Sequence, residues 1–322
     1  MILISKNICC PHCKNNSSSV NVWIKTEVGD ILRCEKCGLG FLNLNPNEIP
    51  VFEELNISTY NMKSYYNLLF RLQHELIKRY NNQLKEISRI VKNKGKLVDI
   101  GCSIGLFLNR AALFGFESYG YDVNKINLEK AGKLFGINIL SDNFLEDKRY
   151  ENLFDVATMW DVLEHLKDPV DFLTKLKHIV KPDGLLVVQC PNMESYEFLK
   201  FRNKWNWLTP GDHLQFFTPK SLYRVLVTAG FIPIKIKLWC NPLTFSNSML
   251  SIRNRNPALL FNRLLFKLIK KLKLGFQRIK VEIPFDKVRE IYGWFLQLIF
   301  HGGHQHSLIK IFAIRPIDKK EL

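Results

Sequence analysis

Between residues 96 and 239, short apolar runs alternate with segments of helical periodicity, and this alternation restricts the fold more than any other feature of the chain. The expected strands are 96–100, 118–121, 137–140, 154–159, 185–190 and 232–239. A last apolar run, 308–314, is expected to add an antiparallel strand. Strands that alternate with helices form a parallel sheet that helices cover on both faces. The sequence therefore predicts an α/β fold.

The composition is that of a globular protein, with 47% hydrophobic and 24% charged residues among 322. The longest apolar stretches contain about eight residues, whereas a helix that spans a membrane needs about 20. The N-terminus lacks the succession of charged, apolar and small residues that marks a signal peptide. We therefore expect a cytoplasmic protein without transmembrane helices.

The net charge of +16 at pH 7 is concentrated in one region. Between Asp212 and Glu282 the chain contains no acidic residue but thirteen Lys or Arg residues. Within this region, a helix over residues 261–272 would carry apolar side chains on one face and basic side chains on the other. We expect residues 255–280 to associate peripherally with an anionic membrane, at its inner surface. The open alternative is a helical lid that packs on the sheet and keeps its lysines in water.

Two C-x2-C pairs near the N-terminus, separated by twenty residues, indicate a metal site. The candidate ligands are Cys10, Cys13, Cys34 and Cys37. At this spacing, two tight turns can present four thiolates to a tetrahedral Zn²⁺ ion. Four thiolates would complete the coordination, so we expect a structural zinc ribbon without a catalytic role. Cys9 leaves the register of the first pair open, and His12 is the other candidate ligand nearby.

A turn that contains glycine follows the first expected strand of the α/β region. Residues 97–108 have the sequence LVDIGCSIGLFL, in which Gly101 allows a sharp turn and Gly105 lets the next helix approach. Backbone amides at such a turn can approach a ligand closely. A dinucleotide fingerprint needs G-x-G-x-x-G, but Ser103 and Leu106 occupy the second and third glycine positions. The alternative is a site for a cationic nucleoside, whose ammonium group Asp99 would help to place.

Three further acidic residues follow later strands and would lie at the same edge of the sheet. Asp122 is placed to accept hydrogen bonds from ribose hydroxyls, and Asp142 to meet an adenine amino group. Asp161 belongs to the run WDVLEH after the fourth strand and would face the same crevice.

The chain resembles the class I S-adenosylmethionine-dependent methyltransferases in five successive stretches: LVDIGCSIGLFL, GYDVN, FDVATMWDVLEHLKDP, GLLVVQCPN and GDHLQFFTPKSLYRVLVTAGF. It is most similar to the branch with D-V-L-E-H-L after strand four and H-x-x-F-F-T before the next helix. The resemblance covers residues 95–240 and the final strand. It implies a Rossmann-like seven-stranded methyltransferase sheet with helices on both faces and S-adenosylmethionine as cofactor. The implied cofactor contacts are Asp99, Gly101, Gly105, Asp122, Asp142 and Asp161. Ser103 departs from the glycine that is usual in the family, but it is small enough for binding to persist.

Methyl transfer to a hydroxyl requires the acceptor to lie close to the methyl group and to lose its proton. His213, in the sequence GDHLQFF, is the candidate general base, because imidazole titrates near neutral pH. Asp212 is expected to orient the His213 ring or to act in its place. A purely structural role for His213 stays open, and for His165 we favour a packing or capping role.

The acceptor is indicated only by a resemblance. N-terminal zinc knuckles joined to this methyltransferase branch resemble enzymes of sugar and surface-polysaccharide biosynthesis. We therefore expect O-methylation of a sugar, glycan or glycolipid precursor. The alternatives are RNA, a lipid or quinone headgroup, and a non-catalytic interaction protein. Nucleic acid is disfavoured because aliphatic residues, not stacking aromatic ones, are interleaved with the basic residues at 255–280.

These features divide the chain into four parts. We expect a zinc-ribbon module at 1–45, a helical linker or cap at 46–94, a methyltransferase core at 95–240 and 305–318, and a basic amphipathic helical insertion at 241–304. The sequence gives no indication of the oligomeric state.

Overall fold

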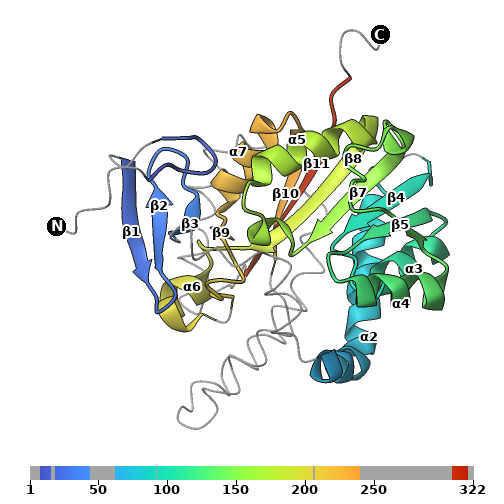
Figure 1. Cartoon of the computed structure of the whole chain (residues 1–322), viewed down its shortest axis with the longest axis horizontal. Coiled ribbons are helices and arrows are strands. Elements are labelled where there is room, and N and C mark those ends of the chain that lie inside the picture. Colours follow the sequence, from blue (N-terminus) through green and yellow to red (C-terminus); the bar gives the residue numbers. More distant parts are fainter. Residues whose placement is uncertain are drawn as a thin grey trace, which may run out of the picture.

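The computed structural model contains two sheets that lie side by side, with helices packed on both faces of the larger one (Figure 1). The structure describes residues 8–15, 19–43, 62–91, 93–205, 207–239 and 307–317. The expected basic insertion at 241–304 lies outside the described residues, as do 46–61 of the expected linker. No helix within the described ranges is long and apolar enough to span a bilayer.

The larger sheet has seven strands in the order β10-β11-β8-β7-β4-β5-β6. Its strands are β4 (Lys96–Ile100), β5 (Glu117–Tyr121), β6 (Asn138–Ile139), β7 (Phe154–Trp160), β8 (Val180–Pro191), β10 (Ile232–Trp239) and β11 (Leu308–Ile314). β4 pairs in parallel with β5 and β7, and β11 pairs antiparallel with both β8 and β10. The predicted seven-stranded Rossmann-like sheet with an antiparallel last strand is confirmed.

The helices divide between the two faces of this sheet (Figure 1). On one face lie α2 (Met62–Ile87), α3 (Leu106–Leu113) and α4 (Lys125–Phe135); on the other lie α5 (Pro169–Ile179) and α7 (Pro219–Thr228). The shorter helices are α6 (Tyr196–Phe201), η2 (Lys148–Tyr150), η3 (Leu163–His165) and η4 (Arg202–Lys204). Local sequence explains where α7 begins: the Thr218 side chain caps it, Ser221 completes a capping box, and proline stands at its first position.

The smaller sheet has the order β1-β2-β3-β9 and joins two distant parts of the chain. β1 (Val20–Lys25), β2 (Asp30–Cys34) and β3 (Gly40–Asn43) come from the N-terminal region, whereas β9 (Gln215–Phe216) follows His213. β3 and β9 pair antiparallel, with Gly40 opposite Phe216. The N-terminal module is therefore continuous with the core through a shared sheet. It also shares a hydrophobic core with the α5–α7 face, in which Leu39 and Phe41 belong to the same buried cluster as Phe217.

An ion-paired group joins α2 to the edge of the larger sheet. Glu86 of α2 pairs with Lys237 of β10 and with Lys310 of β11, the latter at 3.0 Å. The Lys310 side chain is only 7% exposed, so its charge depends on this partner. Burial works against ionisation of Glu86, but the two lysines hold the pKa of its carboxyl below the usual value.

Removing this carboxylate should destabilise the fold. In Glu86→Gln, the buried Lys310 ammonium loses its counter-charge, and we expect a loss of about 3 kcal/mol in the free energy of unfolding, the lower end for a broken buried pair. Glu129→Gln is the matched control, because Glu129 pairs with Lys133 on the exposed face of α4. The measurement is the urea midpoint of each variant. Equal midpoints for the two variants would show that the Glu86 group does not stabilise the packing of α2.

Candidate active site

The turn after β4 forms one side of the candidate site. Gly101 and Ser103 have φ values of 74° and 50°, and Gly105, at 80°, precedes α3. The amides of Gly101 and Cys102 both donate to the Tyr121 carbonyl, at 2.8 and 3.0 Å, which fixes the turn against the end of β5. Serine therefore adopts the left-handed backbone at the position where the related family usually has glycine.

Two of the predicted cofactor carboxylates lie at this turn. The Asp122 carboxylate accepts hydrogen bonds from the backbone amides of Ser103 (2.7 Å) and Asn124 (2.8 Å), so it holds the turn in place. Asp99 is 2% exposed and accepts a hydrogen bond of 2.6 Å from the Thr158 hydroxyl. Burial raises the pKa of Asp99 to about 8, and burial likewise raises the pKa of Asp122. A cationic ligand at this edge would offset the cost of ionising both groups.

Asp161 directly follows β7 and links β8 to helix α2 through its side chain. Its φ of 57° places it in the left-handed region, and the Gln189 amide donates to both of its carboxylate oxygens, at 3.0 and 3.1 Å. Arg79 of α2 forms an ion pair with Asp161 at 3.4 Å. The helix predicted as a linker or cap thus supplies a cation to this edge of the sheet.

Asp142 is more exposed to solvent than the other three carboxylates. Its side chain is 68% exposed and forms an ion pair with Lys125 at the start of α4, which lowers the pKa of Asp142. The structure therefore places Asp142 on the outer rim of the edge that Asp99, Asp122 and Asp161 occupy.

Glu164, His165 and His213 form a cluster beside this edge. One potential ligand atom of each residue lies within 4.8 Å of those of the other two. Glu164 and His165 belong to η3, which follows β7, whereas His213 precedes β9. The Leu214 amide donates to the Glu164 carbonyl at 2.9 Å and so ties the two segments together.

The hydrogen bonds of the two imidazoles differ from the expected ones. Asp212 was expected to orient His213, but it lies against His165: His165 Nδ1 is 2.8 Å from the Asp212 carbonyl oxygen and 3.4 Å from its carboxylate. His213 Nδ1 donates instead to the Trp207 carbonyl at 2.9 Å. The two rings meet edge to face, with their centroids 4.7 Å apart. His165, predicted to pack or to cap, is therefore the imidazole that Asp212 orients.

Burial shifts the protonation of all three residues in the cluster. It raises the pKa of Glu164 to about 8, and burial together with the neighbouring His165 charge lowers the pKa of His213 to about 4. Burial opposes protonation of His165 too, but the hydrogen bond and charge of Asp212 and the charge of Glu164 raise its pKa to about 9. His213 is consequently neutral at pH 7, with its proton on Nδ1 and its lone pair on Nε2.

The four predicted zinc ligands lie together at the end of the smaller sheet. Cys10, Cys13, Cys34 and Cys37 place their sulfur atoms within 4.8 Å of one another. The two turns are alike, because the amide that follows each pair, of Lys14 or of Gly38, donates to the carbonyl of its first cysteine, at 2.9 and 2.8 Å. Cys9 is exposed and lies outside this cluster. His12 Nε2 forms a hydrogen bond of 3.0 Å with the Thr228 hydroxyl of α7. The geometry therefore favours the register with Cys10.

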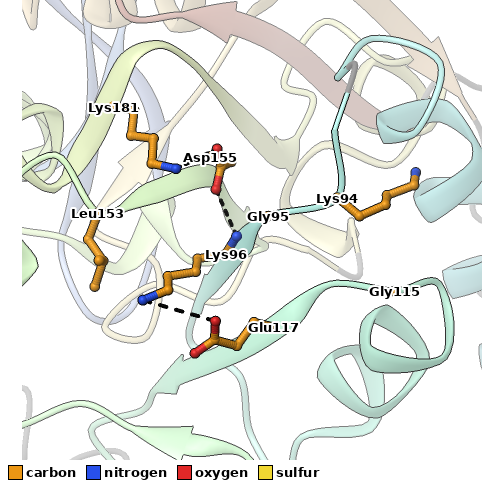
Figure 2. A pocket seen from close by; sticks show the side chains of 8 residues that line it. All are labelled: Lys94, Gly95, Lys96, Gly115, Glu117, Leu153, Asp155 and Lys181. Atoms are coloured by element: carbon orange, nitrogen blue, oxygen red, sulfur yellow. Dashed lines mark hydrogen bonds and ion pairs between the residues drawn. The ribbon is translucent and has the colours of Figure 1, made fainter.

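A hollow of about 420 Å³ lies at the opposite edge of the larger sheet, where β4, β5 and β7 begin (Figure 2). Most of its charged side chains are paired with one another: the Asp155 carboxylate accepts hydrogen bonds from Lys181 Nζ at 2.7 Å and from the Lys96 amide at 2.8 Å. Lys96 Nζ also lies 4.0 Å from Glu117. Ligands of open α/β sheets bind outside the carboxyl ends of the strands, so this hollow is not the candidate active site.

The comparison with protein families decides the class of the chain. The model of the methyltransferase domain matches residues 72–236, which includes the turn after β4, Asp161 and the Glu164–His213 cluster. The chain belongs to this methyltransferase family. It is an S-adenosylmethionine-dependent methyltransferase, as the sequence predicted.

Two relatives are ubiquinone biosynthesis O-methyltransferases. The Rickettsia prowazekii protein is 25% identical over 198 residues, which cover 57% of this chain and 77% of that protein. The Cereibacter sphaeroides protein is 26% identical over 226 residues, which cover 64% of this chain and 91% of that protein. Among solved structures, a SAM-dependent methyltransferase from Archaeoglobus fulgidus aligns with a TM-score of 0.49 and 19% identity, over 78% of this chain and 99% of that one.

The sequence did not single out Glu164, Arg79 or Gln189 as residues of the site. Glu164 had a signal, because it is one of the two acidic residues in the run WDVLEHL, directly before His165. Arg79 lies on a helix whose pattern shows only which residues face the core, so its pairing with Asp161 depends on how α2 docks. Gln189 is fully buried in an apolar strand, where a polar side chain needs a partner.

The turn after β4 leaves no room for a side chain at Gly101. This can be tested in the methyltransferase by comparing two glycines with similar backbone angles. A methyl group on Gly101 (φ +74°) would collide with the branched side chain of Val162, whereas one on Gly136 (φ +63°) would meet nothing within 4 Å. Both alanine variants should lose about 1 kcal/mol of stability from the left-handed backbone. Only Gly101→Ala should also displace the segment of Asp161 and weaken S-adenosylmethionine binding, at least tenfold by calorimetry. Unchanged affinity in Gly101→Ala would separate this turn from the cofactor site.

Proposed function

We propose that this methyltransferase transfers the methyl group of S-adenosylmethionine to a hydroxyl oxygen of its acceptor. The observation that carries the proposal is the position of the Glu164–His165–His213 cluster beside the edge where the predicted cofactor carboxylates lie. Asp122 would accept hydrogen bonds from the ribose, Asp99 would help to place the ammonium group, and Gly101 and Gly105 would leave room for the cofactor. Asp142 and Asp161 would contact the adenine side and the acceptor side of the cofactor, respectively.

The deprotonation of the acceptor is assigned to the segment around His213. Its imidazole is 6% exposed, is neutral at pH 7 and is held by the Trp207 carbonyl. Asp212 would act through His165, which it orients, and not directly on His213. In this assignment, His213 promotes the loss of the hydroxyl proton, and the turn of residues 163–165 holds His213 in position.

For the acceptor, we favour a hydroxylated quinone precursor or lipid headgroup. The support is the similarity to the two ubiquinone biosynthesis O-methyltransferases, one of which this chain covers over 91% of its length. A basic segment at 255–280 that associates with an anionic membrane would suit a lipid-soluble acceptor. The second candidate is a sugar, glycan or glycolipid precursor, which the N-terminal cysteine module favours by its resemblance to enzymes of polysaccharide biosynthesis.

We also propose that the four cysteines hold a structural Zn²⁺ ion. Around a tetrahedral zinc ion with Zn–S bonds of about 2.3 Å, neighbouring sulfur atoms lie about 3.8 Å apart. The Cys10–Cys37 and Cys13–Cys34 sulfur pairs are 3.5 Å apart, close to that value. The ion would stabilise the sheet whose fourth strand, β9, follows His213.

The cofactor assignment can be tested by calorimetry with S-adenosylmethionine. Asp122→Asn should weaken binding by at least tenfold, because the amide can no longer accept all the hydrogen bonds of the turn and the ribose. Asp142→Asn, at the exposed rim, should weaken binding by less than threefold. Equal effects of the two substitutions would contradict the assignment of Asp122.

Transfer of a labelled methyl group should then be measured with a catechol quinone precursor and with nucleotide-linked and lipid-linked sugars. Transfer only to nitrogen acceptors would overturn the proposal of O-methylation.

Zinc removal should affect the acceptor side more than the cofactor side. In Cys13→Ser, the loosened module should disturb β9 and His213, so the rate of methyl transfer should fall at least tenfold while S-adenosylmethionine affinity changes by less than threefold. Cys9→Ser is the matched control, because Cys9 is exposed and outside the cluster. The zinc content of each variant, measured by mass spectrometry, checks the ligand set. Full zinc occupancy in Cys13→Ser would exclude Cys13 as a ligand.

A further inference from the structure

The buried cluster beside the methyl-transfer edge has the donor set of a second metal site. Glu164, His165 and His213 offer one carboxylate and two imidazoles, with ligand atoms within 4.8 Å of one another. Carboxylate and imidazole together suit divalent transition metals such as Mn²⁺, Fe²⁺ and Zn²⁺. The cluster of four cysteines is separate, since its ligands belong to the N-terminal module.

Glu164 provides the independent sign that a ligand belongs here. Its side chain is 1% exposed, and neither of its carboxylate oxygens has a hydrogen-bond partner in the described part of the chain. The Cys190 thiol nearby is only a weak donor. A buried acidic group without a partner is costly, and proteins usually pair such a group or use it to coordinate a metal. A cation between Glu164 and the two imidazoles would satisfy the carboxylate.

The hydrogen bonds of the two histidines are those of metal ligands. His165 Nδ1 and His213 Nδ1 each donate to a backbone carbonyl, that of Asp212 at 2.8 Å and that of Trp207 at 2.9 Å. In a neutral imidazole, a proton fixed on Nδ1 leaves the lone pair on Nε2. Metal-binding histidines are commonly oriented by such a hydrogen bond from their second nitrogen. The backbone therefore orients both rings through Nδ1, and metal binding would release the Nε2 proton of protonated His165.

We propose that Glu164, His165 and His213 bind a divalent transition-metal cation that holds two adjacent oxygens of the methyl acceptor. The acceptor would then be a catechol or a vicinal diol, which can contact one cation through both oxygens. This choice of acceptor rests on the proposed function, whereas the cation site itself does not. Three protein ligands leave further coordination positions for the acceptor. His213 promotes deprotonation as a ligand of the cation, and the cation lowers the pKa of the hydroxyl that it contacts.

The step balances with the cation unchanged. The acceptor hydroxyl loses its proton to water, and a lone pair of its oxygen forms the new O–CH₃ bond. The S–CH₃ bond of the sulfonium breaks, and its electron pair stays on sulfur. The products are the methyl ether, S-adenosylhomocysteine and a proton.

Binding of Mn²⁺ tests the site without any acceptor. The full-length protein, loaded with zinc at its cysteines, is titrated with Mn²⁺ and followed by electron paramagnetic resonance. We expect one bound Mn²⁺ per chain, with modulation from imidazole nitrogen in the spin-echo signal. Glu164→Gln should weaken Mn²⁺ binding at least tenfold. Glu197→Gln should leave it unchanged, because Glu197 is also a buried glutamate (3% exposed) but lies outside the cluster.

The nitrogen modulation is measured on the wild-type protein, so this part of the test does not depend on whether a variant folds. Absence of nitrogen modulation from the wild-type protein, or equal Mn²⁺ affinity in Glu164→Gln and Glu197→Gln, would overturn the cation site. Retained S-adenosylmethionine binding by Glu164→Gln confirms that a loss of Mn²⁺ affinity in that variant is local.

Methyl transfer then separates this inference from the proposed function. With Mn²⁺ present, we expect at least tenfold faster transfer to a catechol than to the corresponding phenol with one hydroxyl, and loss of the difference in Glu164→Gln. Equal rates with both acceptors would overturn the role of the cation in holding the acceptor while leaving O-methylation in place. Mn²⁺ bound with nitrogen modulation but no transfer to any hydroxyl would support the site and contradict the proposed function.

Discussion

The structure depends on a short backbone ladder between two segments that are about 170 residues apart in sequence. β3 of the N-terminal module pairs with β9, and the Leu42 amide extends the contact with a hydrogen bond of 3.0 Å to the Leu214 carbonyl. Leu214 in turn donates to Glu164, next to His165. The chain of backbone contacts thus runs from the cysteine module through the His213 segment to the end of β7. The cysteine module can in this way fix the position of the His165 and His213 side chains.

The sequence predicted most of the larger sheet because each of its strands carries a local signal. Strand and helix periods alternate from residue 96 onward, and the core strands are apolar almost throughout, as in β7 and the second half of β8. The ends were less accurate: β6 contains only Asn138 and Ile139, and β8 already begins at Val180, because hydrogen bonding to neighbours extends or shortens a strand beyond its apolar run. The two-residue strand β9 had no signal, since its pairing with β3 is visible only after both segments have folded.

In the candidate site, too, the sequence predicted the residues that have a local signal and missed the contacts that depend on packing. Asp99, Asp122 and Asp161 could be assigned to one edge from the sequence, because the carboxyl ends of parallel strands meet there. Three contacts could not be predicted: Asp212 with His165, His213 with the Trp207 carbonyl, and Arg79 with Asp161. Each of them depends on how a loop or a helix packs on the sheet, and residue spacing along the chain does not encode this. Burial of Glu164 is of the same kind, since it results from the packing of η3 beneath the segment of His213.

The register of the last two strands has a consequence for how this chain can vary. Trp239, the last residue of β10, is paired directly with Leu308, the first residue of β11, and Leu308 is paired with Pro191 at the end of β8. The polypeptide therefore leaves the sheet and returns to it at neighbouring points, on the same side as the carboxyl ends of the parallel strands. The cost of closing a loop rises only slowly with its length, so the sheet tolerates a tight hairpin turn or an entire added domain at this junction. The fold can in this way change what it presents above the carboxyl ends of its strands without any change in the strands themselves.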